Sequence, residues 1–334
     1  MHNTQQLSIA DQQLSQRKKT SRTAKMLEQI KTFVDWASIE KEVSVINKTH
    51  TEKGGRPPLP LSWKIKMLFV QYLYNLSDPE LEDELIDNLS FQRFVGINWN
   101  NEIPDFTTLW RFKEALIEHR LSDKIFELIQ QQLEGKGLLL KRGTVIDATI
   151  IQSKNRPLSQ EKREQLEQQP SSQIDTDAKS TKKNGQYYFG YKGHIGVDEG
   201  SKLIRKRNFT PANKNDCTEL ENLMSGDEKS IWADKAYPTE KHKRAARFLG
   251  IYFGILDKAK RGQPLSNKQR KRNKQKSAVR AIVEHPFAFI KSKLKYTLAC
   301  ATNLVRNQLR FDMNCIIYNI LLASYLLKRQ NAMG

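Results

Sequence analysis

The sequence predicts an α/β protein in which an all-helical part precedes a mixed sheet. Apolar residues recur at helical spacing from Leu27 to Leu139, whereas short β-branched runs alternate with helical patterns from 140 to 330. The chain of 334 residues is long enough for about two domains. We therefore expect a loose polar segment at 1–26, a helical domain at 27–139 and an α/β domain at 140–330.

The helical domain contains several short helices with recognisable ends. The stretch "SWKIKMLFVQYLYNL" has apolar residues at helical spacing, and "RPPLP" before it ends the preceding segment. Ser77 and Glu80 stand three residues apart, as in a capping box, with Pro79 in the first turn. A further helix is predicted to begin near Asp105 or Thr107. Short helices joined by tight turns are typical of a helix-turn-helix-like module, and equally of a helical scaffold that binds nothing.

Five strands are predicted in the α/β domain, which gives a mixed five-stranded sheet with helices. They are "GTVIDAT", "YFGYKGHIGVD", "KLIRKRNFT", "SIWADKAY" and "IYFGIL". Short helices are predicted at "DCTELENLM" and "PTEKHKRAARFLG", and long helices follow near the end of the chain. The stretch 153–186 is rich in Gln, Ser, Lys and Glu, so we expect a mobile loop there.

The charge of the chain indicates a polyanionic partner. Lys and Arg number 56 against 37 Asp and Glu, which gives a formal charge of +19. Nucleic acid and an anionic membrane are the two candidates. The longest apolar block, Cys315–Leu327, is shorter than the ~20 residues of a spanning helix, which favours nucleic acid over a membrane. No signal-like apolar run begins the sequence and no P-loop motif occurs, so we expect a cytoplasmic protein that does not use ATP.

Two regions are candidates for contact with nucleic acid. The segment 258–276 carries nine cations and no acid, which favours phosphate contact over a merely solvated charge run. Its central cations are Lys268, Arg270, Lys271 and Arg272. In the helical domain, if it binds nucleic acid, the suspected contacts are Trp110, Arg111 and Lys113.

Three acids are candidates for a metal site. Asp147 and Asp234 each end a predicted strand, at the edge of a sheet where ligands commonly bind. Glu284 lies in an otherwise apolar segment and shares one predicted helical face with Ser277, Arg280 and Lys291. Three converging carboxylates repel one another unless a divalent cation lies between them, and oxygen ligands suit Mg²⁺ or Mn²⁺. Arg280 and Lys291 would then hold a substrate phosphate.

These pieces resemble the DDE transposases of bacterial insertion sequences, specifically the IS-five type. The resemblance covers about Gly55 to Leu327 and is carried by "LYNLSDPELEDELIDNLSFQRFVGI", "PDFTTLWRFKEAL", "DATII", "KKNGQYYFGYKGHIGVD", "ADKAY" and "RAIVEHPFAFIK". It implies an RNase H-like catalytic core after a helical DNA-binding domain. By the same resemblance Asp147, Asp234 and Glu284 are the first, second and third acids, and bind two Mg²⁺ (or Mn²⁺) ions.

The family signature around the third acid is matched at all but one position. Arg280, Glu284 and Lys291 fit it, whereas Ser277 stands where the family has Tyr. That difference affects any stacking or hydroxyl role at 277 but not the metal site. Pro286 is expected to kink the helix just after the acid. Tyr237 in "ADKAY" is expected either to position Asp234 or to pack beneath the sheet, with packing slightly favoured.

The resemblance also implies an activity. The expected protein binds the terminal inverted repeats of an insertion sequence, cleaves at its ends and joins the 3′-hydroxyls to target DNA by two-metal phosphoryl transfer. It would act as a homodimer because two ends must be paired, in the bacterial cytoplasm near the nucleoid. Two alternatives stay open: a structure-specific nuclease with the same core, and a decayed transposase that acts only as a DNA-binding regulator.

Overall fold

The computed structural model describes residues 20–46, 59–169, 171, 173–183, 185–234, 236–237, 239–257, 259 and 262–333. The chain divides into two compact units, Met1–Gln132 with Ser324–Gly334, and Leu133–Ala323. The sequence predicts a boundary between 139 and 140, and does not predict that the last residues group with the first unit. Of the segment 1–26, residues 1–19 lie outside the described part, and a helix already begins at Arg22.

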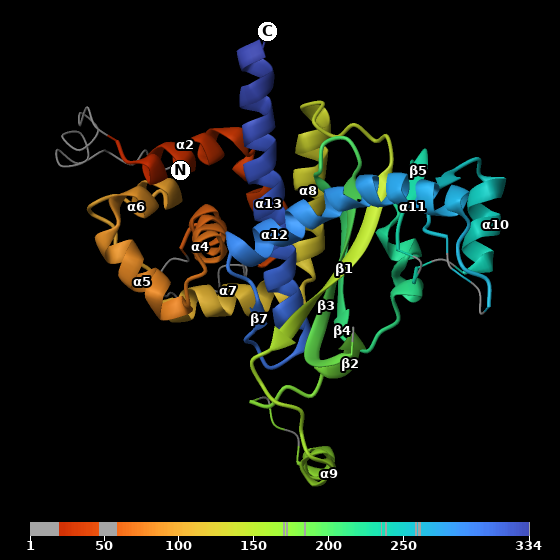
Figure 1. Ribbon diagram of the computed structural model, residues 1–334. Helices are drawn as coiled ribbons and strands as arrows, with labels where there is room; N and C mark the ends of the chain where they lie inside the picture. Colours follow the sequence, from red (N-terminus) through yellow and green to blue (C-terminus); the bar gives the residue numbers. More distant parts are fainter. Residues whose placement is uncertain are drawn as a thin grey trace. The chain divides into compact units, whose positions relative to one another are not determined.

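Helices are the regular elements of the first unit in its described residues, with turns and loops between them and no strand, as the sequence predicted (Figure 1). Its helices are α2 (Arg22–Phe33), α3 (Trp36–Val43), α4 (Leu61–Tyr74), α5 (Asp78–Asp87), α6 (Leu89–Val95), α7 (Phe106–Glu118) and most of α8 (Leu121–Gly135), with a short 3₁₀ turn at Ser44–Ile46. Side-chain caps set their starts: Ser77 and Glu80 form the predicted capping box of α5, and Asp105 caps α7. Asn75 and Gly96, both in the left-handed region, end α4 and α6.

Aromatic residues form the core of the helical unit. The Trp36 ring meets Phe69 and Phe94 edge-on, with ring centroids 5.7 and 5.6 Å apart. Phe69 and Phe94 are almost completely buried and lie 5.7 Å from each other. Because such large side chains remove much apolar surface from water, this cluster holds α3, α4 and α6 together.

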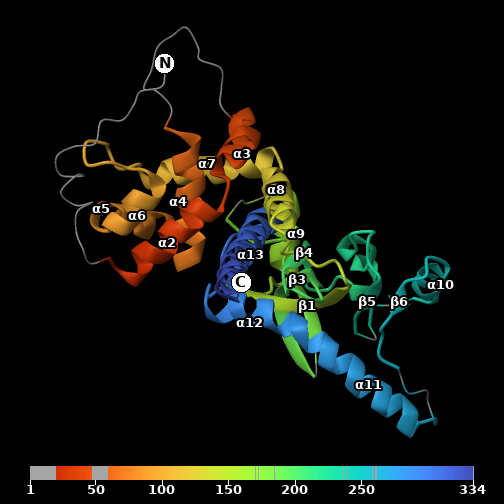
Figure 2. The same cartoon turned by 90° about the horizontal axis from the view of Figure 1, so that it is seen from above.

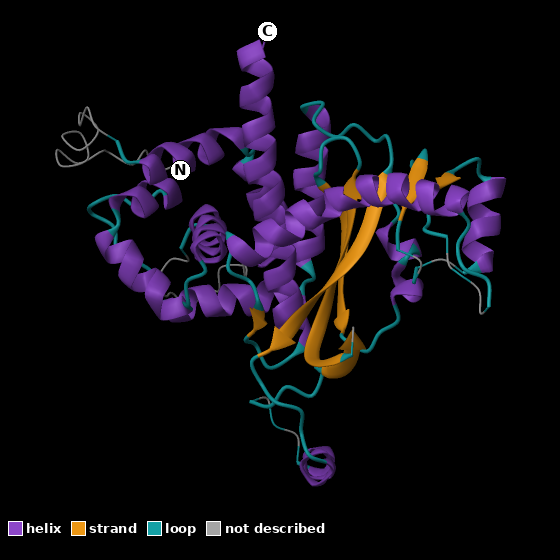
Figure 3. Cartoon of the chain, viewed as in Figure 1, coloured by secondary structure: helices purple, strands orange, loops and turns teal. Residues whose placement is uncertain are grey.

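The second unit is built on one mixed sheet (Figure 3). Its strands are β1 (Thr144–Ser153), β2 (Lys179–Lys183), β3 (Gln186–Asp198), β4 (Ile204–Pro211), β5 (Ser230–Trp232), β6 (Tyr252–Phe253) and β7 (Leu298–Ala299). The prediction of five strands is therefore corrected to seven in the described residues. All five predicted strands are present, and β2 and β7 are the additions.

Strand β1 lies in the middle of the sheet and fixes its topology. It pairs antiparallel with β3, which in turn pairs antiparallel with β4. On its other side β1 pairs parallel with β5, and β5 pairs parallel with β6. The parallel pairing brings the end of β5, and Asp234 just after it, beside the first half of β1. Asp147 is the fourth residue of the ten-residue β1, so the prediction that it ends a strand is wrong, whereas Asp234 does follow the end of β5.

Several segments differ from their sequence predictions. The expected loop 153–186 contains helix α9 (Gln160–Gln168) and strand β2, and "DCTELENLM" forms two 3₁₀ turns, Asp216–Glu219 and Glu221–Leu223. The basic segment is helical from Asn267, because Ser266 and Gln269 form a capping box. Residues 258, 260 and 261 of that segment, and Pro238, lie outside the described residues. Helix α10 is Glu240–Phe248, and Gly250 follows it with a positive φ of 67°.

Three consecutive helical pieces cross the sheet near the start of β1 (Figures 1 and 2). They are α11 (Asn267–Arg280), a 3₁₀ turn (Ala281–Val283) and α12 (Glu284–Ser292). The last helix, α13 (Leu304–Met333), is tied to the sheet by buried polar contacts within the second unit. Asn319 exchanges two 2.8 Å hydrogen bonds with the backbone of Ile204, and Arg207 pairs with Asp312 at 2.7 Å. No helix in the described part of the chain has the length and hydropathy to span a lipid bilayer.

Candidate active site

The register of the two parallel strands places Asp147 beside Asp234. Thr144 pairs with Ile231 and Val145 with Trp232, so corresponding residues differ by 87 positions. The same offset makes Asp147 and Asp234 neighbours just beyond the last paired residues. Because adjacent strands are ~4.8 Å apart, two carboxylates at this level share one small volume.

Arg280 binds both carboxylates at once. Its Nη2 donates to Asp147 Oδ2 at 3.2 Å, and its Nη1 lies 3.5 Å from Asp234 Oδ1. The side chains are 18% exposed for Arg280, 29% for Asp147 and 36% for Asp234, so all three are partly shielded from water. The structure therefore brings together two of the three predicted acids and one of the two predicted phosphate ligands.

Burial sets the electrostatics of the pair. Burial raises the pKa of Asp147, because its charged form loses hydration. The Ala148 N–H, Arg280 and Lys183 act in the opposite direction, and the neighbouring Asp234 adds to the rise. The Ala148 N–H donates to Asp147 Oδ1 at 2.8 Å, which holds the carboxylate in place. The net direction favours the neutral carboxyl, and a cation bound beside it would offset the cost of burying its charge.

Glu284 is not part of this cluster in the structure. It is exposed and begins α12, directly after the 3₁₀ turn. The expected continuous helical face through Ser277, Arg280 and Glu284 is therefore wrong, and the break comes before the acid rather than after it. Among the described residues no three His, Cys, Asp or Glu side chains are arranged to share a metal ion.

Pro286 explains the position of the break. A proline lacks an N–H, and its ring clashes with the carbonyl four residues earlier, here Ile282. The chain avoids the clash because Ala281–Val283 adopts the tighter 3₁₀ form and Pro286 falls in the first turn of α12. Pro286 and Val283 are buried, so this junction is anchored in the unit.

The two aspartates fit a divalent cation, although three ligands are not assembled. Both are oxygen donors, the type that Mg²⁺ and Mn²⁺ prefer. The guanidinium of Arg280 already spans them, which shows that the space between the carboxylates accommodates positive charge. A metal bound there would compete with Arg280 for the same oxygens.

Tyr237 is buried and braces the turn that carries Asp234. Its ring is 1% exposed in a cluster with Ile146 and Leu220, and its N–H donates to the Asp234 carbonyl at 3.1 Å. Burial, followed by the charge of Asp147, raises the pKa of its hydroxyl. Tyr237 therefore packs beneath the sheet, and its backbone also holds the turn that follows Asp234.

The basic helix presents its cations to solvent. Lys268, Arg270 and Lys271 are exposed, and Arg272 is 58% exposed while lying 3.5 Å from Asp257. Asn273 exchanges two hydrogen bonds with the backbone of Asp257, at 2.8 and 3.1 Å, so one side of α11 is fastened to the unit. The other side is open for phosphate contact.

The remaining residues predicted to contact DNA differ in their exposure to solvent. In α7, Trp110 is 48% exposed and Arg111 is exposed. Lys113 instead forms a 2.6 Å ion pair with Asp78 of α5 and is only 17% exposed, so DNA contact there would require breaking that pair. In α12, Lys291 is partly buried, and burial, followed by repulsion from Lys183, lowers its pKa.

Lys183 is a cation near the acids that the sequence reasoning missed. Its charge lowers the pKa of both Asp147 and Lys291, although it lies far from either in the sequence. Lys183 is exposed at the end of β2, just before the reversal into β3. The signal was the Asn-Gly dipeptide at 184–185, which is typical of a hairpin turn.

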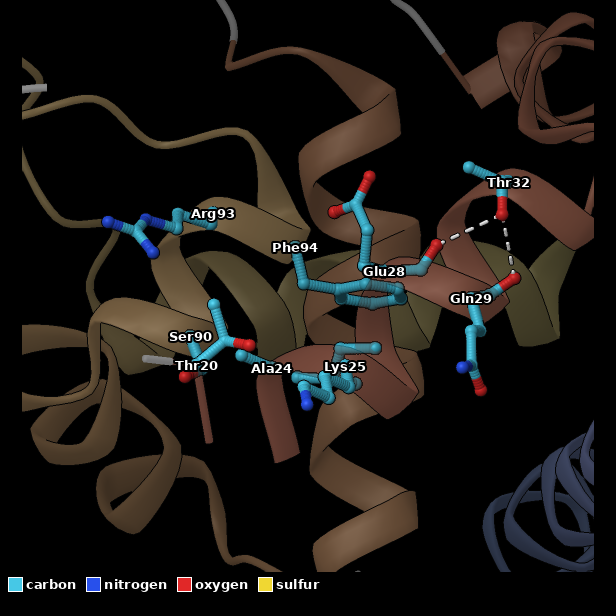
Figure 4. A pocket seen from close by; sticks show the side chains of 10 residues that line it. Thr20, Ala24, Lys25, Glu28, Gln29, Thr32, Ser90, Arg93 and Phe94 are labelled. Carbon is cyan, nitrogen blue, oxygen red and sulfur yellow. Dashed lines mark hydrogen bonds between the residues drawn. The ribbon is translucent and has the colours of Figure 1, made fainter. Parts of the chain in front are cut away.

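A pocket of about 380 Å³ lies in the helical unit, between α2 and α6 (Figure 4). Lys25, Glu28 and Arg93 are among the residues that line it, and the Thr32 hydroxyl donates to the carbonyls of Glu28 and Gln29 beside it. The aromatic ring of Phe94 also lines this pocket. It belongs to a different compact unit from the aspartates.

Comparisons with known proteins place the chain in a family. Residues 139–320, more than half of the chain, match the family described as "Transposase DDE domain", and residues 12–115 match "Transposase domain (DUF772)". The chain is also similar to a solved structure of piggyBac transposase in a synaptic complex with hairpin DNA, with 11% sequence identity and a TM-score of 0.45. The matched region covers 92% of this chain and 75% of the piggyBac chain. On the strength of the family matches, the chain belongs to the transposases that carry a DDE domain.

Proposed function

We propose that this transposase acts on an insertion sequence of the IS-five type: it binds the terminal inverted repeats, cleaves at the ends and joins the 3′-hydroxyls to target DNA. The observation that carries the proposal is the pairing of Asp147 with Asp234 beneath Arg280. The signature residues Arg280, Glu284 and Lys291 support the IS-five type.

The sheet supports an RNase H-like core for this activity. Strand β1 is central, antiparallel to β3 and parallel to β5, so two acids from distant sequence positions lie side by side where β5 ends. The helix that carries Glu284 follows α11, which ends at Arg280 on the same carboxylates. Glu284 is thus about one helical turn, ~6 Å along the axis, from a residue already at the site.

Asp147 and Asp234 would hold divalent metal, with Glu284 as the third ligand. Bound Mg²⁺ or Mn²⁺ ions would supply activation of the attacking hydroxyl and stabilisation of the leaving oxygen. Arg280, released from the carboxylates, would turn to the scissile phosphate, and Lys291 would hold the same phosphate. Tyr237 would keep the Asp234 turn fixed, because its ring is locked in the core.

The remaining parts would bind DNA away from the reacting phosphate. The exposed cations of α11 would contact backbone phosphates, and the helical unit, through Trp110 and Arg111, would read the inverted repeats. Because two ends must be paired before joining, the active form would be a homodimer on DNA. No step of this scheme uses ATP.

A cleavage assay with matched variants tests the proposal. The full-length protein is incubated with Mg²⁺ and DNA from the borders of its own element, and nicks are mapped. Asp147→Ala, Asp234→Ala and Glu284→Ala should each abolish cleavage while DNA binding survives. Glu221→Ala, which removes a carboxylate that is 67% exposed, should cleave normally.

Strand transfer with pre-cut ends separates the proposed activity from its nearest rival. A transposase joins such ends to a target, whereas a nuclease of the same fold does not. Normal joining by any one of the three alanine variants would show that its assignment is wrong. Binding without cleavage by the unmodified protein would favour the regulator instead.

A further inference from the structure

The β2–β3 hairpin has features that the proposed function has not used. Its strands pair antiparallel from Lys179 opposite Gly190 to Lys183 opposite Gln186. Within it, Lys182 lies directly opposite Tyr187, so the two side chains project from the same face. The pair of Lys182 and Tyr187 lies one residue pair from the end of the β2–β3 ladder, where Lys183 is opposite Gln186.

Gly190 marks the point where the hairpin leaves the main sheet. Strand β3 pairs with β2 from Gln186 to Gly190 and with β1 from Gly190 to Asp198. Gly190 has φ +149°, and a Cβ there would lie 2.4 Å from the Ile151 carbonyl oxygen and 2.5 Å from the Ser153 nitrogen. Only glycine allows so close an approach, and β3 bends away from β1 at this end (Figure 1). The hairpin is therefore a defined arm rather than a frayed edge.

Tyr187 is exposed and lies beneath a lysine of the neighbouring strand. The side chain is 73% exposed, more than is usual for so large an aromatic group. The Lys182 ammonium lies 4.9 Å from the ring centroid, over the face of the ring. This cation–π contact orients the ring and leaves its other face available to stack on a flat partner.

The surroundings of Tyr187 favour an anion as partner. From Lys179 to Val197 the sequence contains no acidic residue, and Lys179, Lys182 and Lys183 are all exposed. The strands of the arm therefore carry positive charge without a compensating carboxylate.

We propose that Lys182 and Tyr187 form a stacking platform for an unpaired base of bound DNA, with Lys183 on the adjoining phosphate. This inference rests on the proposed function, because that function makes DNA the partner of this unit. Aromatic side chains stack on bases whose faces are free, as in single strands and frayed or cut ends, whereas bases inside a duplex cover one another. A second protein copy suits the arm less well, since three lysines without an acid repel their like.

Binding without metal tests the platform separately from cleavage. The probes are a short duplex with a single-stranded overhang that carries 2-aminopurine, and the same duplex with blunt ends. Tyr187→Ala should weaken binding of the overhang probe about 5- to 100-fold, the range for losing one aromatic–base stack, and leave the blunt probe unchanged. Tyr187→Phe should bind like the unmodified protein and quench 2-aminopurine equally.

Two control variants guard against trivial explanations. Tyr325→Ala removes another exposed tyrosine, 60% exposed in α13, and should change neither probe. Lys182→Gln and Lys183→Gln should weaken both probes and reduce their salt dependence, whereas Lys229→Gln, at an exposed lysine before β5, should not. Thermal unfolding of each variant checks that the fold is retained.

The platform is overturned if Tyr187→Ala matches Tyr325→Ala on the overhang probe, or if both probes weaken equally. It is also overturned if the substitution changes self-association without DNA, because the ring would then be a protein contact. The proposed function can fail separately from the platform. If the protein prefers the overhang probe through Tyr187 but never cuts DNA, the platform is supported and the transposase reaction is wrong. If cleavage depends on Asp147 but binding does not depend on Tyr187, the reaction is supported and the platform is wrong.

Discussion

Replacing Arg280 by glutamine should weaken the metal-free protein and strengthen its binding of metal. Arg280 lies 3.2 Å from Asp147 and 3.5 Å from Asp234, on the oxygens proposed to bind the ion. Exposed ion pairs contribute about 0.2–1 kcal/mol and breaking a buried one costs about 3–5 kcal/mol, so this partly exposed cluster is worth about 1–3 kcal/mol. Because metal would no longer displace the guanidinium, affinity should rise roughly 5- to 100-fold.

Calorimetric titration with Mn²⁺, together with urea unfolding with and without the ion, measures both effects. Lys274→Gln is the matched control, since it removes one exposed positive charge from the same helix. Arg280→Gln should also cut DNA poorly despite its tighter metal, because Arg280 is proposed to hold the scissile phosphate. Equal Mn²⁺ affinity in the two variants and the unmodified protein would refute the reasoning that metal and guanidinium share these oxygens.

Three further predictions concern other parts of the second unit. Metal-free Asp147→Asn should be more stable than the unmodified protein near pH 7 in urea unfolding. Because burial raises the folded pKa of Asp147, the unmodified protein loses stability as the pH rises and this carboxyl ionises. The difference between the two proteins should vanish below about pH 3.8, where the carboxyl is protonated in both the folded and the unfolded state. Replacing four cations of α11 together by neutral residues, Lys268, Arg270, Lys271 and Arg272, should make DNA binding less dependent on salt. The slope of the logarithm of the DNA-binding constant against the logarithm of salt concentration should become smaller in magnitude by roughly 0.9 for each DNA phosphate that the helix no longer neutralises. Asn319→Leu should cost about 2–4 kcal/mol in urea unfolding, because the two buried hydrogen bonds between the Asn319 amide and the Ile204 backbone are lost.

Each of these has a contrary outcome. A less stable Asp147→Asn at neutral pH would mean that Arg280 more than offsets the burial of the carboxylate. An unchanged salt slope would remove α11 from the DNA-binding surface. An Asn319→Leu protein as stable as its parent would show that water or another group satisfies Ile204.

The aspartate pair was predictable because its geometry is local to the strands. Each acid follows a short β-branched run, and the parallel pairing of β1 with β5 brings the two runs side by side. Only Asp234 follows a strand end; Asp147 lies within β1, which continues to Ser153. The position of Glu284 was not, because the prediction placed Arg280 and Glu284 on one helical face and expected the break after the acid, whereas it comes before it. Each of the three 3₁₀ residues at Ala281–Val283 turns the chain by about 120° rather than 100°, so Glu284 is rotated by roughly 60° from the expected face.

Elements with polar composition, and contacts between distant residues, escaped the sequence analysis. Strand β2 lies in a Lys- and Ser-rich stretch that lacks hydrophobic alternation, and β7 has only two residues. The ion pairs of Lys113 with Asp78, and of Arg207 with Asp312, join residues 35 or more positions apart. Such pairs depend on how helices and strands pack, which periodicity does not reveal.

A structure of the full-length protein with Mn²⁺ and DNA ends would show whether the three acids bind metal together, since the anomalous signal of manganese locates the ions. We expect manganese between Asp147 and Asp234, Glu284 turned in to complete the ligand set, and Arg280 moved to a DNA phosphate. Manganese bound elsewhere, with Arg280 still bridging the two aspartates on bound DNA, would contradict this expectation.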